Sequence, residues 1–272
     1  MYEDYFLTLR NRGYSVYNYS ECRNCVIFIL EKFNDASKKK YMLKLFMSRN
    51  SPDSDTLRSW YNSYRIRSEK LGRYHYDDVK IPHILEFWGN EYVNGFGKTF
   101  GVLADYIKGR TLSSTLCNGL DTQGERQRLL LRVMPDYIGA VEYGNKAGYY
   151  HLDIDECNLL VDIHNRGWLI DHIGAFICDD YSRGKQPFGG YFHCYSEKIA
   201  AGPSEAHEKA ARCKADSAEC ERLQTIMLIR LINGVFDRDT TEDLIRRCVD
   251  NAGGVSPLRL LRESLGGLDA GE

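Results

Sequence analysis

The chain has 272 residues, which is long enough for one large domain or two lobes. Of these residues, 43% are hydrophobic and 27% are charged, as is typical of a globular protein. Its 36 basic and 38 acidic side chains leave a formal net charge of −2, which argues against nucleic acid or an anionic membrane as a partner. Nine cysteines include one close pair, Cys22 and Cys25, but no second pair to complete a zinc site, so reduced thiols in a cytoplasmic protein are expected.

The first third of the chain predicts a small, mostly antiparallel sheet with one main helix. Residues 25–33 and 40–47 are short β-rich runs joined by a polar segment, which is typical of a hairpin. Apolar residues at helical spacing predict a helix from about 54 to 72. Two further strands are expected at 83–93 and 98–107, with a glycine-containing turn between them.

The rest of the chain is predicted to be mostly helical. Residues 124–148 form an amphipathic pattern, 217–236 a largely apolar one that should lie at the centre of its lobe, and 256–265 the last helix. The N-terminus lacks the apolar core of a signal peptide, and Arg230 interrupts the late apolar run. No membrane span is therefore expected.

An oxygen-rich stretch lies between these helices, "HLDIDECNLLVD" at 151–162. It ends in "NLLVD" (158–162), which predicts a strand, and a second short strand is expected at 168–176. Carboxylates and an amide so close together form either a solvated acidic loop or a site that holds a metal ion and activates a hydroxyl.

Four residues, taken in chain order, distinguish these two interpretations. Lys44 ends the strand motif "YMLK", Asp153 and Asn158 lie in "HLDIDECN" after His151, and Asp171 lies in "LIDHIG". This series resembles the strand lysine, the H-R-D-x-x-x-x-N catalytic loop and the D-F-G motif of the protein kinase superfamily. The chain is similar to a divergent, compact, eukaryotic-like Ser/Thr protein kinase of the bacterial effector or viral type.

The resemblance implies an α+β, bilobal, protein kinase-like fold. Residues 1–104 would form an N-lobe with a small antiparallel sheet and one main helix, 105–110 the hinge, and 111–272 a mostly helical C-lobe with the catalytic loop and activation segment. In the latter, "YSE" with Glu197 resembles the A-P-E motif that closes the activation segment.

The resemblance also implies roles for the motif residues, with ATP and Mg²⁺ as cofactors. Lys44 would hold the α- and β-phosphates of ATP, Asn158 and Asp171 would hold Mg²⁺, and Asp153 would orient the acceptor hydroxyl and take its proton. His151 is expected to pack under the loop.

Further residues would bind the nucleotide. Glu69, on the helix predicted at 54–72, is the candidate partner of Lys44, although no motif identifies it. "VLADYIKGRTL" resembles a kinase hinge, which places Ala104 at the gatekeeper position and the adenine-binding backbone groups near Asp105 and Ile107.

The sequence departs from the kinase pattern in four places. The stretch 19–25 has no phosphate-covering glycines, and Leu152 replaces the arginine that pairs with a phosphorylated activation loop. Asp155 replaces a lysine that would contact the transferred phosphate, and His172–Ile173 replace the Phe and Gly of D-F-G. The loss of the arginine resembles kinases that need no phosphorylation switch, whereas Asp155 leaves the substrate class open.

Three functions remain open at this point. The first is transfer of the γ-phosphate of ATP to Ser/Thr hydroxyls of a protein substrate, which would be a host protein in the host cytosol if the chain is a secreted effector. The second is a small-molecule kinase of the aminoglycoside or choline kinase type. The third is a nucleotide-binding pseudokinase scaffold. The segment around Glu197 favours the first function, and the retained motif residues disfavour the third.

Overall fold

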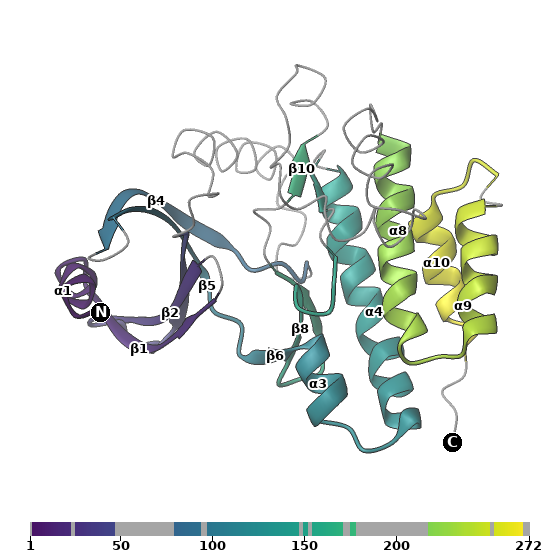
Figure 1. Cartoon of the computed structure of the whole chain (residues 1–272), viewed down its shortest axis with the longest axis horizontal. Coiled ribbons are helices and arrows are strands. Elements are labelled where there is room, and N and C mark those ends of the chain that lie inside the picture. Colours follow the sequence, from purple (N-terminus) through teal and green to yellow (C-terminus); the bar gives the residue numbers. More distant parts are fainter. Residues whose placement is uncertain are drawn as a thin grey trace. The chain divides into compact units, whose positions relative to one another are not determined.

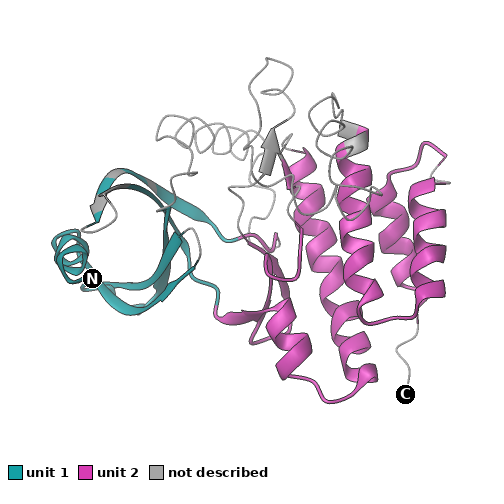
Figure 2. Ribbon diagram, viewed as in Figure 1, with its two compact units in different colours: residues 1–66, 82–107 teal, residues 67–81, 108–272 magenta. Residues whose placement is uncertain are grey.

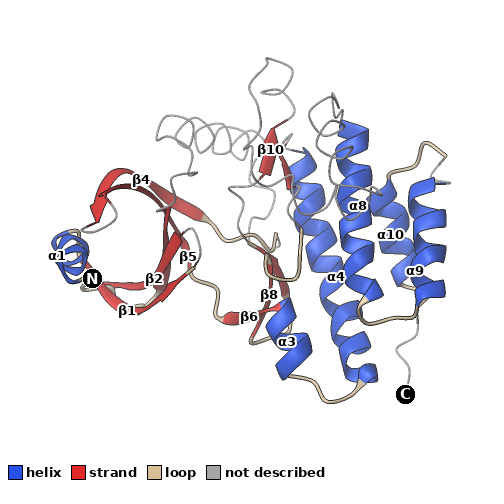
Figure 3. Cartoon of the chain, in the orientation of Figure 1, coloured by secondary structure: helices blue, strands red, loops and turns tan. Residues whose placement is uncertain are grey.

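The computed structural model describes residues 2–22, 25–46, 79–93, 97–146, 149–151, 154–170, 175–177, 217–250 and 253–268. The chain divides into two compact units (Figure 2). Unit 1 is Met1–Ile66 with Pro82–Ile107, and unit 2 is Arg67–Ile81 with Lys108–Glu272. Antiparallel strands form the sheet of unit 1, whereas unit 2 is mostly helical among its described residues (Figure 3). The protein is therefore a mixed α+β structure.

Unit 1 contains one described helix and a five-stranded sheet (Figure 1). Its elements are α1 (Glu3–Asn11), β1 (Tyr14–Glu21), β2 (Cys25–Lys32), β3 (Lys40–Phe46), β4 (Ile84–Val93) and β5 (Gly97–Asp105). The strand order is β1-β2-β3-β5-β4, and every neighbouring pair is antiparallel. The predicted hairpin and the two later strands are confirmed, whereas the helix predicted at 54–72 lies outside the described residues.

The sheet of unit 1 has one largely apolar face. Alternate residues of β2 and β3 are completely buried on it: Val26, Phe28, Leu30, Leu43 and Leu45. Because side chains alternate between the faces of a strand, the residues between these point the other way, and Lys44 is one of them. Helix α1 covers the apolar face by burying Tyr5 and Leu9.

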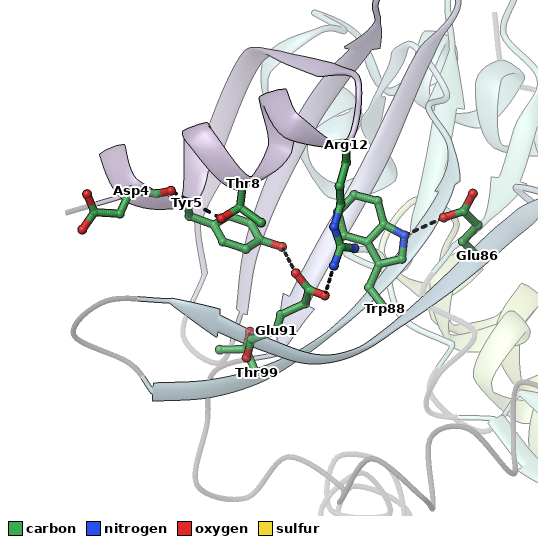
Figure 4. A network of polar contacts seen from close by, with 8 residues as sticks. All are labelled: Asp4, Tyr5, Thr8, Arg12, Glu86, Trp88, Glu91 and Thr99. Carbon is green, nitrogen blue, oxygen red and sulfur yellow. Dashed lines mark hydrogen bonds and ion pairs between the residues drawn. The ribbon is translucent and has the colours of Figure 1, made fainter.

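A buried polar network fastens α1 to the sheet (Figure 4). The carboxylate of Glu91 on β4, with only 3% of the residue exposed, accepts hydrogen bonds from the Tyr5 hydroxyl (3.1 Å) and the Arg12 guanidinium (2.7 Å). Arg12 also lies over the ring of Trp88, 4.3 Å from its centroid. Burial, and next the charge of Glu91, raise the pKa of Tyr5, so its hydroxyl stays protonated and donates. Helix α1 is thus an integral part of unit 1.

Unit 2 contains five described α-helices, one π-helical turn and five short strands. The helices are α3 (Leu112–Asn118), α4 (Gln123–Lys146), α8 (Ser217–Asn233), α9 (Arg238–Ile245) and α10 (Pro257–Leu265), with the π-helical turn at Arg246–Asp250. The strands are β6 (Gly109–Thr111), β7 (Tyr149–His151), β8 (Leu159–Asp162), β9 (Gly167–Leu169) and β10 (Ala175–Ile177).

Helices α4 and α8 lie at the centre of unit 2 and pack against each other (Figure 1). Both contribute completely buried apolar side chains: Leu130, Met134 and Ile138 from α4, and Leu228, Ile229 and Ile232 from α8. This confirms the central position predicted for the apolar helix at 217–236. Within the described parts of the chain, no helix is both long enough and apolar enough to cross a bilayer.

Residues 79–81 belong to unit 2, although the sequence placed them in the first lobe. Ile81 is buried in the core of unit 2, and Val79 packs against that core. The amide of Leu169 on β9 donates to the carbonyl oxygen of Lys80 at 2.9 Å. The segment therefore supports the strand that leads to the candidate site. The chain passes from unit 1 to unit 2 between Ile107 and Lys108, which lies within the stretch 105–110 where a hinge was expected.

Candidate functional site

Short strands bracket the oxygen-rich stretch in unit 2. β7 ends at His151, and β8 begins at Leu159 directly after Asn158. The strand predicted at 158–162 is thus confirmed. β8 pairs with β9 in an antiparallel hairpin, in which Leu159 lies opposite Leu169, and β7 pairs with β10, in which His151 lies opposite Ala175. Two ladders therefore tie the chain before and after the stretch to later segments.

Ile170 is the residue at which the motifs meet. Its amide donates to the carbonyl oxygen of Asn158 at 2.9 Å. Its own carbonyl oxygen lies 3.2 Å from Nε2 of His151, and because a carbonyl only accepts, this ring nitrogen donates. Both backbone groups of Ile170 are therefore bound by residues of "HLDIDECN", and the next residue in the chain is Asp171.

His151 has the structural role that the sequence predicted. Only 3% of the residue is exposed, and its own carbonyl oxygen accepts from Nε2 of the fully buried Gln224 on α8 at 3.2 Å. Oε1 of Gln224 in turn accepts from Nδ2 of Asn145 on α4 at 2.8 Å. A chain of buried hydrogen bonds thus connects the two central helices to the strand that enters the loop. Such bonds are strong where water is excluded.

A tight turn at Asp155 delivers Asn158. Oδ1 of Asp155 accepts hydrogen bonds from the amides of Cys157 (2.7 Å) and Asn158 (2.9 Å). From the first turn of α3, the Ser113 amide donates to the carbonyl oxygen of Glu156 at 3.2 Å, which holds the turn from outside. This role of Asp155 was not predicted from the sequence. The available signal was an aspartate two and three residues before the residues whose amides it binds, which is the spacing of an Asx-turn.

A second aspartate, Asp162, forms the other end of β8. Its Oδ1 accepts from the amides of His164 (2.8 Å) and Arg166 (3.0 Å), and its Oδ2 from Nε of Arg166 (2.8 Å) and the indole of Trp168 (3.0 Å). Burial alone would raise the pKa of this carboxyl, but the donors from Arg166, Trp168 and His164 outweigh burial and hold it below its usual value.

The β8–β9 hairpin is fixed to helix α4. The amide of Gly167 donates to Oδ2 of Asp136 at 2.8 Å, and the Tyr137 hydroxyl donates to the carbonyl oxygen of Leu160 at 3.3 Å. A Cβ at position 167 would lie 2.5 Å from the ring of Tyr137 and 2.8 Å from the carbonyl oxygen of Val133, so only glycine allows this close approach. The candidate loop therefore rests on a rigid support.

In unit 1, Lys44 lies on β3, the third strand of the sheet. It pairs with Ile27 of β2 and Val102 of β5, and the next residue pair on the same face is Met42 with Ala104. The Lys44 ammonium lies 5.2 Å from the ring centroid of Phe46. Around the lysine, this face is thus apolar.

The predicted adenine-binding backbone lies where β5 ends. The amides of Asp105 and Tyr106 are already engaged, donating to the carbonyl oxygens of His83 (2.9 Å) and Lys40 (3.3 Å). The carboxylate of Asp105 pairs with Nζ of Lys39 at 2.8 Å. Ile107 follows the last strand residue, and its amide makes no backbone hydrogen bond within the described residues. Of the three amides from 105 to 107, that of Ile107 is the one open to a ligand.

Several predicted site residues fall outside the described residues: Glu69, Leu152, Asp153, Asp171, His172, Ile173 and Glu197. The described part of the chain holds no group of three acidic, histidine or cysteine side chains arranged for a metal ion. It does contain Asn158, whose side-chain amide oxygen is a type of ligand that Mg²⁺ binds. What the structure brings together is thus His151, Asp155, Asn158 and Ile170 in unit 2 and, separately, Lys44 and Ala104 in unit 1.

Comparison with known proteins finds no family model that matches this chain and no curated protein that matches its sequence. The resemblance to protein kinases therefore rests on the sequence motifs alone, and the described geometry adds the contacts between their residues.

Proposed function

We propose that this chain is an ATP- and Mg²⁺-dependent phosphotransferase that transfers the γ-phosphate to Ser/Thr hydroxyls of a protein substrate. The observation that carries the proposal is the bonding of Ile170 by both His151 and Asn158. It links the motif that contains Asp153 to the residue before Asp171. A carboxylate for the acceptor hydroxyl and oxygen donors for Mg²⁺ are thereby expected in one place, which is what phosphoryl transfer requires.

Each residue of the loop has a role in this proposal. The amide oxygen of Asn158 and the carboxylate of Asp171 would hold Mg²⁺, since this ion takes oxygen ligands. Bound there, the ion would neutralise charge on the phosphates. Asp153 would orient the acceptor hydroxyl and take its proton. His151 binds no substrate, because its buried ring fixes the backbone at Ile170.

Unit 1 would supply the nucleotide site. Lys44 lies on the third strand, the context in which a kinase lysine pairs with the α- and β-phosphates. Apolar residues on the same face, Val102 and Ala104 among them, suit a flat adenine ring. The amide of Ile107 would donate to the ring edge. The stretch 19–25 contains no glycine, so Lys44 would be the main phosphate contact in unit 1.

The proposal is tested by incubating the protein with γ-labelled ATP and Mg²⁺, once with cell-lysate proteins and once with hydroxyl compounds that carry a positive charge. The parent should label protein Ser/Thr residues, and Asp153→Asn should lower the rate by roughly two to four orders of magnitude while nucleotide binding persists. Glu156→Gln is the matched control, because it also exchanges a loop carboxylate for an amide, and it should keep the rate.

Each other outcome selects a different function. Labelling of the cationic compounds alone would replace the proposal with a small-molecule kinase. Nucleotide binding without transfer to any acceptor would replace it with a pseudokinase scaffold. Equal transfer by the parent and Asp153→Asn would remove Asp153 from the chemistry.

A further inference from the structure

A single side chain accepts two hydrogen bonds within the turn that carries Asn158. Oδ1 of Asp155 is shared between two amides, those of Cys157 and Asn158, and the Asn158 amide also lies 3.1 Å from the carbonyl oxygen of Asp155. These hydrogen bonds fold four residues back on themselves. Completely buried side chains, Ile154 and Leu159, anchor the two ends of the turn.

The backbone of Asn158 is consequently fixed on both sides. Its amide is bound by Asp155, and its carbonyl oxygen accepts from the Ile170 amide. With both peptide groups held, the direction in which the Cα–Cβ bond of Asn158 leaves the chain is determined. Loss of the Asp155 carboxylate would leave the Asn158 amide with the carbonyl oxygen of Asp155 as its remaining acceptor, whereas the bond from the Ile170 amide would be kept.

Asp155 could instead serve as a negative charge for a cationic substrate, because it replaces a kinase lysine that would contact phosphate. The geometry favours the structural use, since Oδ1 points at the backbone of its own turn and not away from it. Glu156 is the neighbouring carboxylate, and no hydrogen bond of its carboxylate occurs within the described residues. Glu156 therefore carries a negative charge at the same turn but lacks the contacts that Asp155 makes with the amides of Cys157 and Asn158.

We propose that Asp155 is the positioning residue for the metal ligand Asn158. By accepting from the amides of Cys157 and Asn158, its carboxylate would set the angle at which the Asn158 side chain meets Mg²⁺. Groups that orient a ligand in this way typically change metal affinity when they are removed. This inference rests on the proposed function, because it takes Asn158 as a ligand of the nucleotide-bound ion.

The test compares three variants by the Mg²⁺ concentration that gives half-maximal nucleotide binding. Asp155→Ala removes both contacts and should raise this concentration about tenfold to a hundredfold. Asp155→Asn keeps an oxygen that can accept from both amides and should restore the parental value. Glu156→Ala removes one negative charge from the turn and should leave the value unchanged.

A second measurement follows the turn itself and needs neither nucleotide nor activity. Amide hydrogen exchange at Cys157 and Asn158 should be faster in Asp155→Ala than in the parent, and should stay at the parental rate in Asp155→Asn and Glu156→Ala. If Asp155→Ala does not fold, Asp155→Ser replaces it, because a hydroxyl accepts from the same amides more weakly.

Three results would overturn the inference. An unchanged Mg²⁺ requirement in Asp155→Ala would show that Asn158 needs no such support. A requirement raised equally in Asp155→Asn and Asp155→Ala would show that the charge matters and the hydrogen bonds do not. If the parent binds no nucleotide with Mg²⁺, the proposed function fails and the metal role of Asp155 with it, while the exchange rates still report separately whether Asp155 holds the turn.

Discussion

The two turns that flank β8 are both built on an aspartate, yet they use it differently. Asp162 is 6% exposed, and both of its carboxylate oxygens accept hydrogen bonds, with the Arg166 guanidinium closing a salt bridge at 2.7 Å. Asp155 is half-buried, and among the described residues its carboxylate accepts hydrogen bonds only at Oδ1, from two backbone amides. The Asp162 carboxylate is thus closed to solvent, whereas that of Asp155 is partly open to it.

This difference indicates what each turn contributes. A buried carboxylate that is paired and fully hydrogen-bonded becomes costly to disturb, so the turn at Asp162 holds the hairpin together. The half-buried carboxylate of Asp155 fixes the backbone of its turn but leaves the turn accessible to solvent. The turn at Asp155 can therefore present Asn158 to a ligand. If Asn158 binds Mg²⁺ as proposed, the stabilising turn and the ligand-binding turn lie at opposite ends of one short strand.

The largest effect is expected for Asp162→Ala. The change removes the acceptor for Trp168, Arg166 and two amides, and it should lower the free energy of unfolding by about 3 kcal/mol. Urea denaturation of unit 2 checks this value. A loss similar to that of an ordinary surface substitution would mean that the turn is held by the backbone alone, and the contrast between the two turns would disappear.

The same carboxyl gives a pH dependence with a defined sign. The pKa of Asp162 in the folded protein lies below its ordinary value of 3.8, so its ionised form stabilises the fold. This stabilisation is complete well above pH 3.8 and is lost as the pH falls through 3.8 toward the folded pKa. The difference in unfolding free energy between the parent and Asp162→Asn should therefore shrink with acidification from pH 6, and a constant difference would contradict the assignment.

Glu91 in unit 1 tests whether a buried carboxylate that is paired with an arginine stabilises the fold elsewhere in the chain. Its carboxylate is as enclosed as that of Asp162 and is bound by Tyr5 and Arg12. Glu91→Gln should lower the free energy of unfolding by about 2 kcal/mol, because one charge-assisted bond becomes neutral and the Arg12 charge loses its partner. Glu86→Gln on the same strand is the matched control, since Glu86 is exposed, and its loss should stay below about 1 kcal/mol.

The smallest effect on stability is expected for Asp155→Ala. Water reaches the half-buried turn and can replace the lost acceptor at both amides, so the free energy of unfolding should fall by about 1 kcal/mol or less. Thermal unfolding beside Asp162→Ala gives a direct ranking. If Asp155→Ala proves as destabilising as Asp162→Ala, the turn at Asp155 has the same structural role as the turn at Asp162.

The fold could be predicted where short β-rich runs are separated by a polar segment. The runs at 25–33 and 40–47 predict β2 and β3 because both are rich in apolar residues and polar residues join them. β1 and α1 had no such signal: five consecutive residues of β1, from Tyr17 to Glu21, are exposed, and α1 buries only Tyr5 and Leu9. The position of α1 depends on Glu91, far along the chain, and a contact at that separation leaves no local pattern in the sequence.

The candidate site likewise contains features that a local sequence pattern predicts and features that depend on long-range contacts. Motif spacing predicted that His151 would pack beneath the loop and that Asn158 would precede a strand, and both are observed. The turn at Asp155 was not predicted, because the kinase pattern has a lysine at this position. The contacts of Asp155 with the amides of Cys157 and Asn158 do not follow from that pattern. That Ile170 accepts a hydrogen bond from His151 and donates one to Asn158 depends on the register of two ladders, which single-sequence patterns do not determine.

The central claim is that Asn158 presents a metal ligand for a nucleotide, and titration calorimetry with a non-hydrolysable ATP analogue tests it most directly. The parent should bind the analogue more tightly with Mg²⁺ than without it. Asn158→Ala should lose about tenfold or more of the affinity measured with Mg²⁺ while keeping the affinity measured without it. Equal affinities of the parent and Asn158→Ala in the presence of Mg²⁺ would contradict the account.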